Sequence, residues 1–188
     1  MDEALLFKNA DAWANWLKEH HASVAGVWLR LGKKGSLERA VIYAEALEVA
    51  LCFGWIDGQK KSYSEHQFLQ RFSPRGAKSI WSKINREKAL ALVESGTMQP
   101  AGLAQIERAK ADGRWDRAYA GSRTIEVPED LQFALDAVPK ALAFFKTLNS
   151  QNRYAILFRI GNVKKAETRD KKIKAFVEML RKGEKIHP

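Results

Sequence analysis

The segment Cys52–Asn85, CFGWIDGQKKSYSEHQFLQRFSPRGAKSIWSKIN, decides the fold because it holds two extended runs joined by a polar turn. Residues 55–63 and 67–74 are predicted strands, and the polar residues 64–66 form the turn between them. The second run alternates Phe, Gln and Phe with Leu and Arg, which is the period of a strand with one buried face. Pro74 ends it. The segment therefore predicts an antiparallel β-hairpin.

A further strand and two helices precede the hairpin. GVWLRLG, residues 26–32, also alternates in hydrophobicity and is predicted to be a third strand. One helix is expected after a cap residue, Asn9 or Asp11, and another within residues 38–53. The expected first domain, residues 1–114, is therefore α+β, with helices packed on a small antiparallel sheet of three strands.

The rest of the chain is expected to be helical. Asn85 is expected to cap one helix, and Pro100 begins the next. Residues 114–127 are less regular and form the expected linker. Four more helices are predicted at residues 128–137, 139–148, 150–160 and 166–182. A helical second domain is therefore expected at residues 115–188.

Several motifs together carry a family resemblance. Tyr43, Glu45, Ala46 and Leu47 precede ALCFGWIDG, and QRFSPR, KSIWSKIN, GLAQIERAKADGRWD, NRYAILFRI and FVEMLRKGEKIHP follow. These motifs span nearly the whole chain and resemble the YdeI/OmpD-associated family, whose members are also labelled bacteriocin-protection proteins. The resemblance implies an α+β N-terminal part and a helical C-terminal domain, and it implies no particular reaction. The dipeptide 76–77, Gly-Ala, departs from the bulkier basic residue and proline expected there.

Composition limits the class of protein. Of the 188 residues 46% are hydrophobic, which is enough to bury a sizeable core. No apolar run approaches the roughly 18 residues of a membrane-spanning helix, so no membrane insertion is expected. The first residues lack the pattern of a secretory signal, and the single cysteine cannot form an internal disulfide. We therefore expect a cytoplasmic protein. Its net charge of +10 favours anionic partners.

No cofactor and no metal site is expected. The sequence has no glycine-rich phosphate loop and no dinucleotide-binding fingerprint. Its four histidines are not spaced from another ligand as zinc sites require, and one cysteine excludes a thiolate cluster.

The strongest candidate for a ligand site lies in the hairpin segment. Between Arg71 and Lys88, six cations stand against one acid, a local net charge of +5. Cations beside aromatic rings can hold a phosphate and stack a base or a sugar. The candidate ligand-binding residues are Trp55, Asp57, Arg71, Arg75, Lys78, Trp81 and Lys83. Alternatively, the tryptophans belong to the core and the cations are solvated.

Two residues of this segment have further explanations. Asp57 lies inside a predicted strand, where aspartate is disfavoured. An ion pair with Arg71 on the neighbouring strand would explain it, as would a role as general base or as acceptor for a ribose hydroxyl. Cys52 ends an apolar helical run and is expected in the core, because a nucleophilic cysteine needs an activating neighbour.

These observations favour a non-enzymatic stress or protection module that binds an anionic ligand or an acidic partner protein at the hairpin. One alternative is an enzyme that acts on a phosphorylated small molecule through Asp57, Glu45 or Cys52. The other is a protein that binds nucleic acid weakly and non-specifically, because residues 153–188 contain eleven cations and four acids. A solvated helix face is the ordinary explanation of such a charge pattern.

Overall fold

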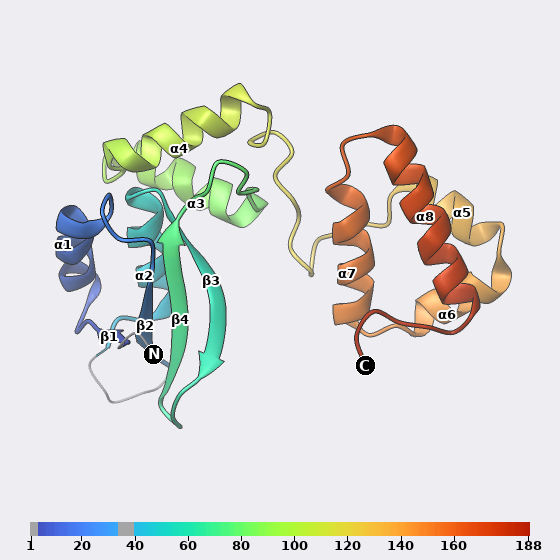
Figure 1. The fold of residues 1–188 in the computed structure, drawn as a ribbon, viewed down its shortest axis with the longest axis horizontal. Helices are drawn as coiled ribbons and strands as arrows, with labels where there is room; N and C mark the ends of the chain where they lie inside the picture. The colour runs from blue at the N-terminus through green and yellow to red at the C-terminus, as the bar shows by residue number, and fades with distance from the viewer. Residues whose placement is uncertain (1–3, 34–39) are drawn as a thin grey trace. The chain divides into compact units, whose positions relative to one another are not determined.

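The structure, a computed structural model, describes residues 4–33 and 40–188 (Figure 1). These residues form four strands and eight helices in two compact units, of which the first ends at Ala118 and the second begins at Tyr119. The boundary expected from sequence fell between residues 114 and 115. Among the described helices, none combines the length and apolar character needed to cross a bilayer.

The first unit contains the sheet and four helices. In chain order its elements are β1 (Leu5–Leu6), α1 (Ala10–His20), β2 (Val27–Gly32), α2 (Tyr43–Cys52), β3 (Trp55–Ser62), β4 (Gln67–Pro74), α3 (Lys83–Glu94) and α4 (Pro100–Ala111). The helix predicted within residues 38–53 is observed as α2, and its first two residues, 38–39, lie outside the described ranges. The N-cap of α3 is Ser82, whose hydroxyl accepts a hydrogen bond from the Asn85 amide, so the prediction that Asn85 is the cap was wrong.

The sheet is mixed and has the strand order β1-β2-β4-β3. β1 runs parallel to β2, whereas β4 pairs antiparallel with both β2 and β3. The α+β class and the hairpin are therefore confirmed, but the sheet predicted as three-stranded and antiparallel is four-stranded. β1 was missed because two residues are too few to show a period of two.

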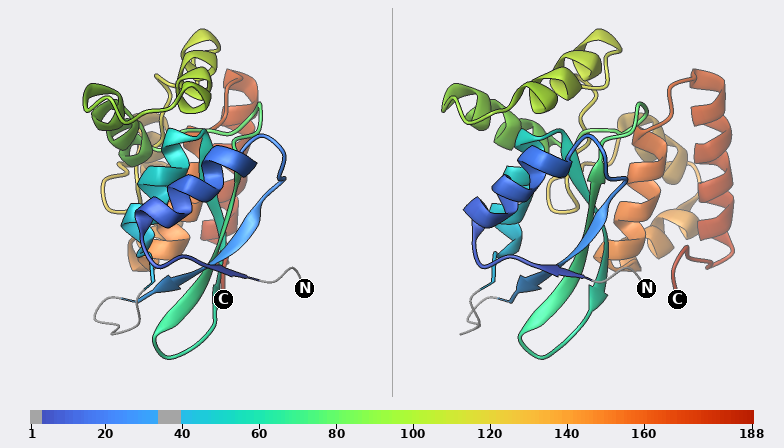
Figure 2. Two further views of the ribbon diagram at one scale, coloured as in Figure 1. Left: turned by 90° about the vertical axis from the view of Figure 1, so that its left-hand side faces the viewer. Right: turned by 60° about the vertical axis from the view of Figure 1, so that its left-hand side comes forward.

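The two faces of the sheet differ in burial. The inner face, which α1 and α2 cover (Figure 2), consists of Val27, Leu29, Leu31, Phe68, Gln70 and Phe72. The outer face of the same two strands consists of the alternating residues Trp28, Arg30, Leu69 and Arg71, which are half-buried. The core lies between the inner face and the two helices, where Trp13 of α1 packs on Phe72 with ring centroids 5.9 Å apart.

The second unit is a bundle of four helices: α5 (Glu129–Asp136), α6 (Pro139–Thr147), α7 (Ser150–Gly161) and α8 (Ala166–Arg181). Its core includes Leu135, Ile156 and Leu180, all fully buried. A bidentate ion pair between Arg169 of α8 and Asp130 of α5 links the helices and lowers the pKa of the Asp130 carboxyl.

A close contact between α2 and α4 in the first unit gives a stability prediction. A Cβ added to Gly102 would lie 2.4 Å from the Cys52 carbonyl oxygen and 2.7 Å from that of Leu51. Because these are backbone atoms, α4 would have to shift away from α2. We expect Gly102→Ala to lower the free energy of unfolding, measured by urea titration, by about 2–3 kcal/mol. The control Gly161→Ala, whose Cβ meets nothing within 4 Å, should change it by less than about 1 kcal/mol; equal losses would contradict this packing.

Candidate functional site

A β-bulge in β3 places two charged residues on the inner face of the sheet. Asp57 pairs with Phe72 and Lys60 pairs with Gln70, so that residues 58–59 together oppose a single residue of β4. In a regular strand, residues three positions apart point to opposite faces. The extra residue restores the phase, and Asp57 and Lys60 therefore share the face of their buried partners.

The bulge is held by a buried side chain of the neighbouring strand. Gln70 is only 3% exposed, and its Nε2 donates to the carbonyl oxygens of Gly58 at 2.9 Å and Gln59 at 3.2 Å. Carbonyl groups displaced from a regular ladder need such partners, because an unpaired buried polar group is costly. The position of Lys60 thus depends on a glutamine in the core.

Beside the bulge lies a hollow of about 410 Å³, which reaches to the first residue of α2. Its lining residues are Tyr43, Asp57, Gly58, Lys60, Phe68 and Gln70. The Tyr43 hydroxyl donates to Asp57 Oδ2 at 2.9 Å, and Lys60 Nζ lies 4.1 Å from the centre of the Phe68 ring. A carboxylate, a phenol, an ammonium group and an aromatic wall therefore meet in a space large enough for a small organic ligand.

The ion pair expected between Asp57 and Arg71 does not occur. Asp57 belongs to the inner face, whereas Arg71 belongs to the outer face and is paired with Trp28 of β2. Among the described residues Asp57 forms no ion pair, and its hydrogen-bond donor is Tyr43 instead. The prediction failed because the two side chains project from opposite sides of the sheet.

Trp55, another candidate from the sequence, belongs to the core. Its ring is buried, and its Nε1 donates to the His21 carbonyl oxygen at 3.1 Å. The ring packs edge-to-face against Trp13 with centroids 6.1 Å apart. Trp55 therefore supports the inner face and does not line the hollow.

Arg75 and Trp81 do come together, in a second cluster formed after β4. Arg75 is 5% exposed, and its Cζ lies 3.6 Å from the centre of the buried Trp81 ring. Its Nη1 donates to the Ile80 carbonyl oxygen at 3.3 Å, while Nη1 of Arg114 donates to the Ser79 carbonyl oxygen at 2.5 Å. Two guanidinium groups thus bind consecutive carbonyls and hold the segment between β4 and α3.

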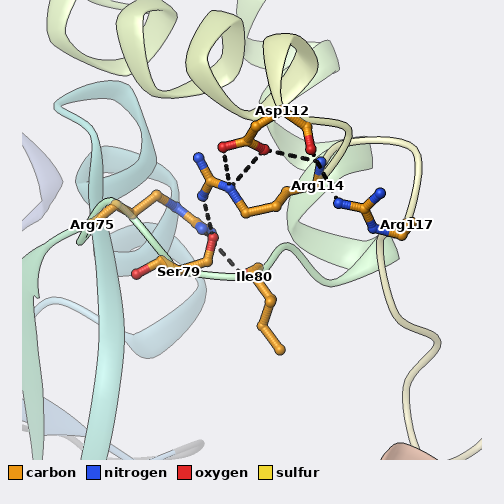
Figure 3. A network of polar contacts seen from close by, with 6 residues as sticks. All are labelled: Arg75, Ser79, Ile80, Asp112, Arg114 and Arg117. Carbon is orange, nitrogen blue, oxygen red and sulfur yellow. Dashed lines mark hydrogen bonds and ion pairs between the residues drawn. The ribbon is translucent and has the colours of Figure 1, made fainter. Parts of the chain in front are cut away.

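A single carboxylate supports this arginine cluster from the end of α4. Both oxygens of Asp112 lie 2.8 Å from Arg114 Nε, and the main-chain oxygen of Asp112 accepts from Arg117 (Figure 3). Trp81 packs edge-to-face on Trp115 with centroids 4.9 Å apart. The cluster therefore joins the end of the hairpin to the end of α4, and its tryptophans are core residues.

The seven candidate residues are thus distributed over several environments. Asp57 lines the hollow; Trp55, Arg75 and Trp81 are buried; Arg71 lies on the outer face. Lys78 and Lys83 are exposed. Sequence reasoning missed Tyr43, Lys60 and Gln70, although a glycine inside a strand, Gly58, is a signal for a bulge.

Cys52 is buried, as expected for a core residue. Burial raises the pKa of its thiol, the Glu48 charge adds to this, and a hydrogen bond with Thr97 opposes it. The thiol is therefore protonated at neutral pH. Among the described residues there is also no group of three or more histidine, cysteine or acidic side chains placed to bind a metal ion.

The arginine cluster gives a prediction on stability. Arg114→Ala removes a buried guanidinium together with its bonds to Asp112 and to the Ser79 carbonyl oxygen, so the first unit should lose about 2–3 kcal/mol in urea unfolding. Arg117→Ala is the matched control, because that side chain is exposed, and it should cost no more than about 0.5 kcal/mol. If the two variants were equally stable, the cluster would not be structural.

Comparison with known families matches both units. Residues 5–105 match a family described as "Domain of unknown function (DUF8412)", and residues 124–183 match the family described as "Bacteriocin-protection, YdeI or OmpD-Associated". Searches of curated proteins and of solved structures returned no match. The first match covers more than half of the chain and the second covers most of the helical unit. The chain therefore belongs to the DUF8412 domain family, and its second unit contains a domain that matches the YdeI/OmpD-associated, or bacteriocin-protection, family.

Proposed function

We propose that the first unit binds a small organic anion that carries hydroxyl groups, in the hollow beside the bulge of β3. The observation that carries this proposal is the meeting of the Asp57 carboxylate, the Tyr43 hydroxyl and the Lys60 ammonium group around one space of about 410 Å³. A ligand that satisfies all three groups must offer both hydroxyl groups and negative charge. Sugar acids and sugar phosphates form this class.

Asp57 supplies the part of the site that recognises hydroxyl groups. One carboxylate oxygen accepts the hydrogen bond from Tyr43, which fixes the orientation of the group. The other oxygen, Oδ1, accepts no hydrogen bond from the described residues and is available to a ligand hydroxyl. Hydrogen bonds to an ionised acceptor are stronger than those between neutral groups, so one carboxylate can select a hydroxylated ligand.

Lys60 supplies the positive charge. Its ammonium group is placed against the Phe68 ring on the same face as Asp57, and no described acid forms an ion pair with it. The charge is therefore not neutralised by a carboxylate of the protein, and an incoming carboxylate or phosphate group can take that position. This arrangement supports binding without requiring any chemical change in the ligand.

The proposal predicts a graded affinity for four probes, measured by isothermal titration calorimetry on the full chain. D-gluconate and D-glucose 6-phosphate should bind more tightly than D-glucose, which lacks the charge, and than inorganic phosphate, which lacks the carbon-bound hydroxyl groups. Equal affinity for glucose and gluconate, or no binding of any probe at about 10 mM, would refute the site.

A pair of adjacent lysines provides the matched test of the site. Lys60→Gln should weaken gluconate binding at least about tenfold, because the charged partner of the anion is lost. Lys61→Gln makes the same change one residue further on the outer face, where Lys61 pairs with Leu69, and should leave gluconate affinity within about twofold. Asp57→Asn keeps the shape of the site and should reduce the preference for gluconate over simple acetate.

A further inference from the structure

The outer face of the sheet is a basic, aromatic surface that the proposed small-molecule site does not use. Three cations from three strands lie on this face: Arg30 of β2, Arg71 of β4 and Lys61 of β3. Two rings, those of Trp28 and Tyr63, lie among them. No acidic residue occurs among the outward-pointing positions of the paired stretches of these strands. The face is therefore positively charged and complementary in charge to a polyanion.

The cations and rings are ordered in pairs. Lys61 Nζ lies 4.4 Å from the centre of the Trp28 ring, and Arg30 Cζ lies 5.6 Å from the centre of the Tyr63 ring. Arg30 Nη1 also donates to the Tyr63 hydroxyl at 3.1 Å. Tyr63 is 51% exposed, although a ring of that size would usually be more buried. These contacts hold cationic groups close to the exposed ring of Tyr63 and the half-buried ring of Trp28.

The register of the strands makes this a continuous strip. Arg30, Leu69 and Lys61 face one another across β2, β4 and β3, so they form one row. Adjacent strands are about 4.8 Å apart, which places the main-chain positions of Arg30 and Lys61 about 10 Å from each other. Trp28 and Arg71 form the next row. In the first unit, α1 and α2 lie against the other face of the sheet (Figure 2), so they leave this strip uncovered.

The second basic region of the chain differs because several of its cations, on α8, form ion pairs. On α8, Lys171 pairs with Glu167, Lys174 with Asp170, and both Arg181 and Lys182 with Glu178. Such exposed pairs within one helix partly neutralise their own charge. On the outer face of the sheet, by contrast, none of the three cations forms an ion pair with a described residue. A polyanion is therefore better matched to the sheet than to α8.

We propose that the outer face of the sheet binds single-stranded nucleic acid, with Arg30, Lys61 and Arg71 contacting phosphates and the rings of Trp28 and Tyr63 stacking on bases. A sheet face with exposed rings suits unpaired bases, whose faces are accessible, whereas the bases of a duplex are already stacked. Reading a duplex usually requires an element that enters a groove, and a broad sheet face offers none. This inference is independent of the small-molecule site, which lies on the opposite face.

The test is fluorescence anisotropy with the full chain and labelled oligothymidylate and oligouridylate of about 15 nucleotides. Lys61→Gln and Arg71→Gln should each weaken binding several-fold. Each should also make the slope of log affinity against log salt concentration shallower by about 0.7 per lost phosphate contact. Tyr63→Ala, which removes an exposed ring, should weaken binding about tenfold without reducing the salt slope.

Two variants are controls for this face. Lys60→Gln removes the same charge from the inner face, and Lys171→Gln removes one from α8. Both should leave oligonucleotide affinity within about twofold. Losses as large as that of Lys61→Gln would overturn the proposal, because binding would then follow net charge and not this face. Equal or tighter binding of a duplex of the same length, of heparin or of phosphatidylglycerol vesicles would overturn it too.

The same lysine pair separates the two proposals. If only Lys60→Gln weakens gluconate binding and only Lys61→Gln weakens oligonucleotide binding, both faces act as proposed. If no sugar acid or sugar phosphate binds while the oligonucleotide result holds, the small-molecule site alone is refuted. If neither variant changes oligonucleotide binding, the outer-face proposal is refuted whatever the outcome with gluconate.

Discussion

The β-bulge in β3 is the constraint on which both surfaces of the hairpin depend. Lys60 and Lys61 are neighbours in sequence, so in any strand they point to opposite faces, but the residues before them decide which lysine takes which face. With residues 58–59 opposing one residue of β4, Lys60 joins Asp57 on the inner face and Lys61 joins Arg71 on the outer face. Without the extra residue the two lysines would exchange positions. Gln59 would then oppose Gln70 at the inner hollow, and Lys61 would lie one pair further along that face, opposite Phe68.

Maintaining the bulge requires a polar residue in an otherwise apolar layer. Gln70 lies between Phe68 and Phe72 on β4, and its amide must reach two main-chain carbonyls of β3 to be satisfied. Bulges and lysines on an edge strand have a simpler use as well, since they discourage pairing with other chains. That use does not account for Asp57, whose carboxylate is oriented by Tyr43 from a different element. The side-chain arrangement is thus more specific than protection of an edge requires.

Local periodicity could predict the hairpin, the helices of the second unit and the α+β class, because each depends on a pattern of several residues. It could not predict features that depend on one residue or on distant partners. β1 is too short for a period, and Ser82 and Asn85 are both good cap residues three positions apart. The predicted Asp57–Arg71 pair assumed that nearby strands bring nearby charges together, whereas the pairing of β3 and β4 puts them on opposite faces. In the arginine cluster, Arg75 and Arg114 bind neighbouring carbonyl groups, those of Ile80 and Ser79, although the two arginines are almost forty positions apart in the sequence.

Charge counting also did not show which cations the fold leaves without a carboxylate partner. The largest local excesses were those of residues 71–88 and 153–188. In the first, Arg75 is buried against Trp81 and helps to hold the main chain, so its charge is committed to the fold. In the second, several cations of α8 form exposed ion pairs with acids of the same helix, and each such pair adds little to stability or to the electrostatic field around the protein. Of the cations in the two proposals, Arg71 lies in the first region, whereas Arg30, Lys60 and Lys61 lie outside both. A cation is available to a ligand when it lies against an aromatic ring or beside a hollow and has no carboxylate partner. In this sheet these conditions depend on strand register and not on composition.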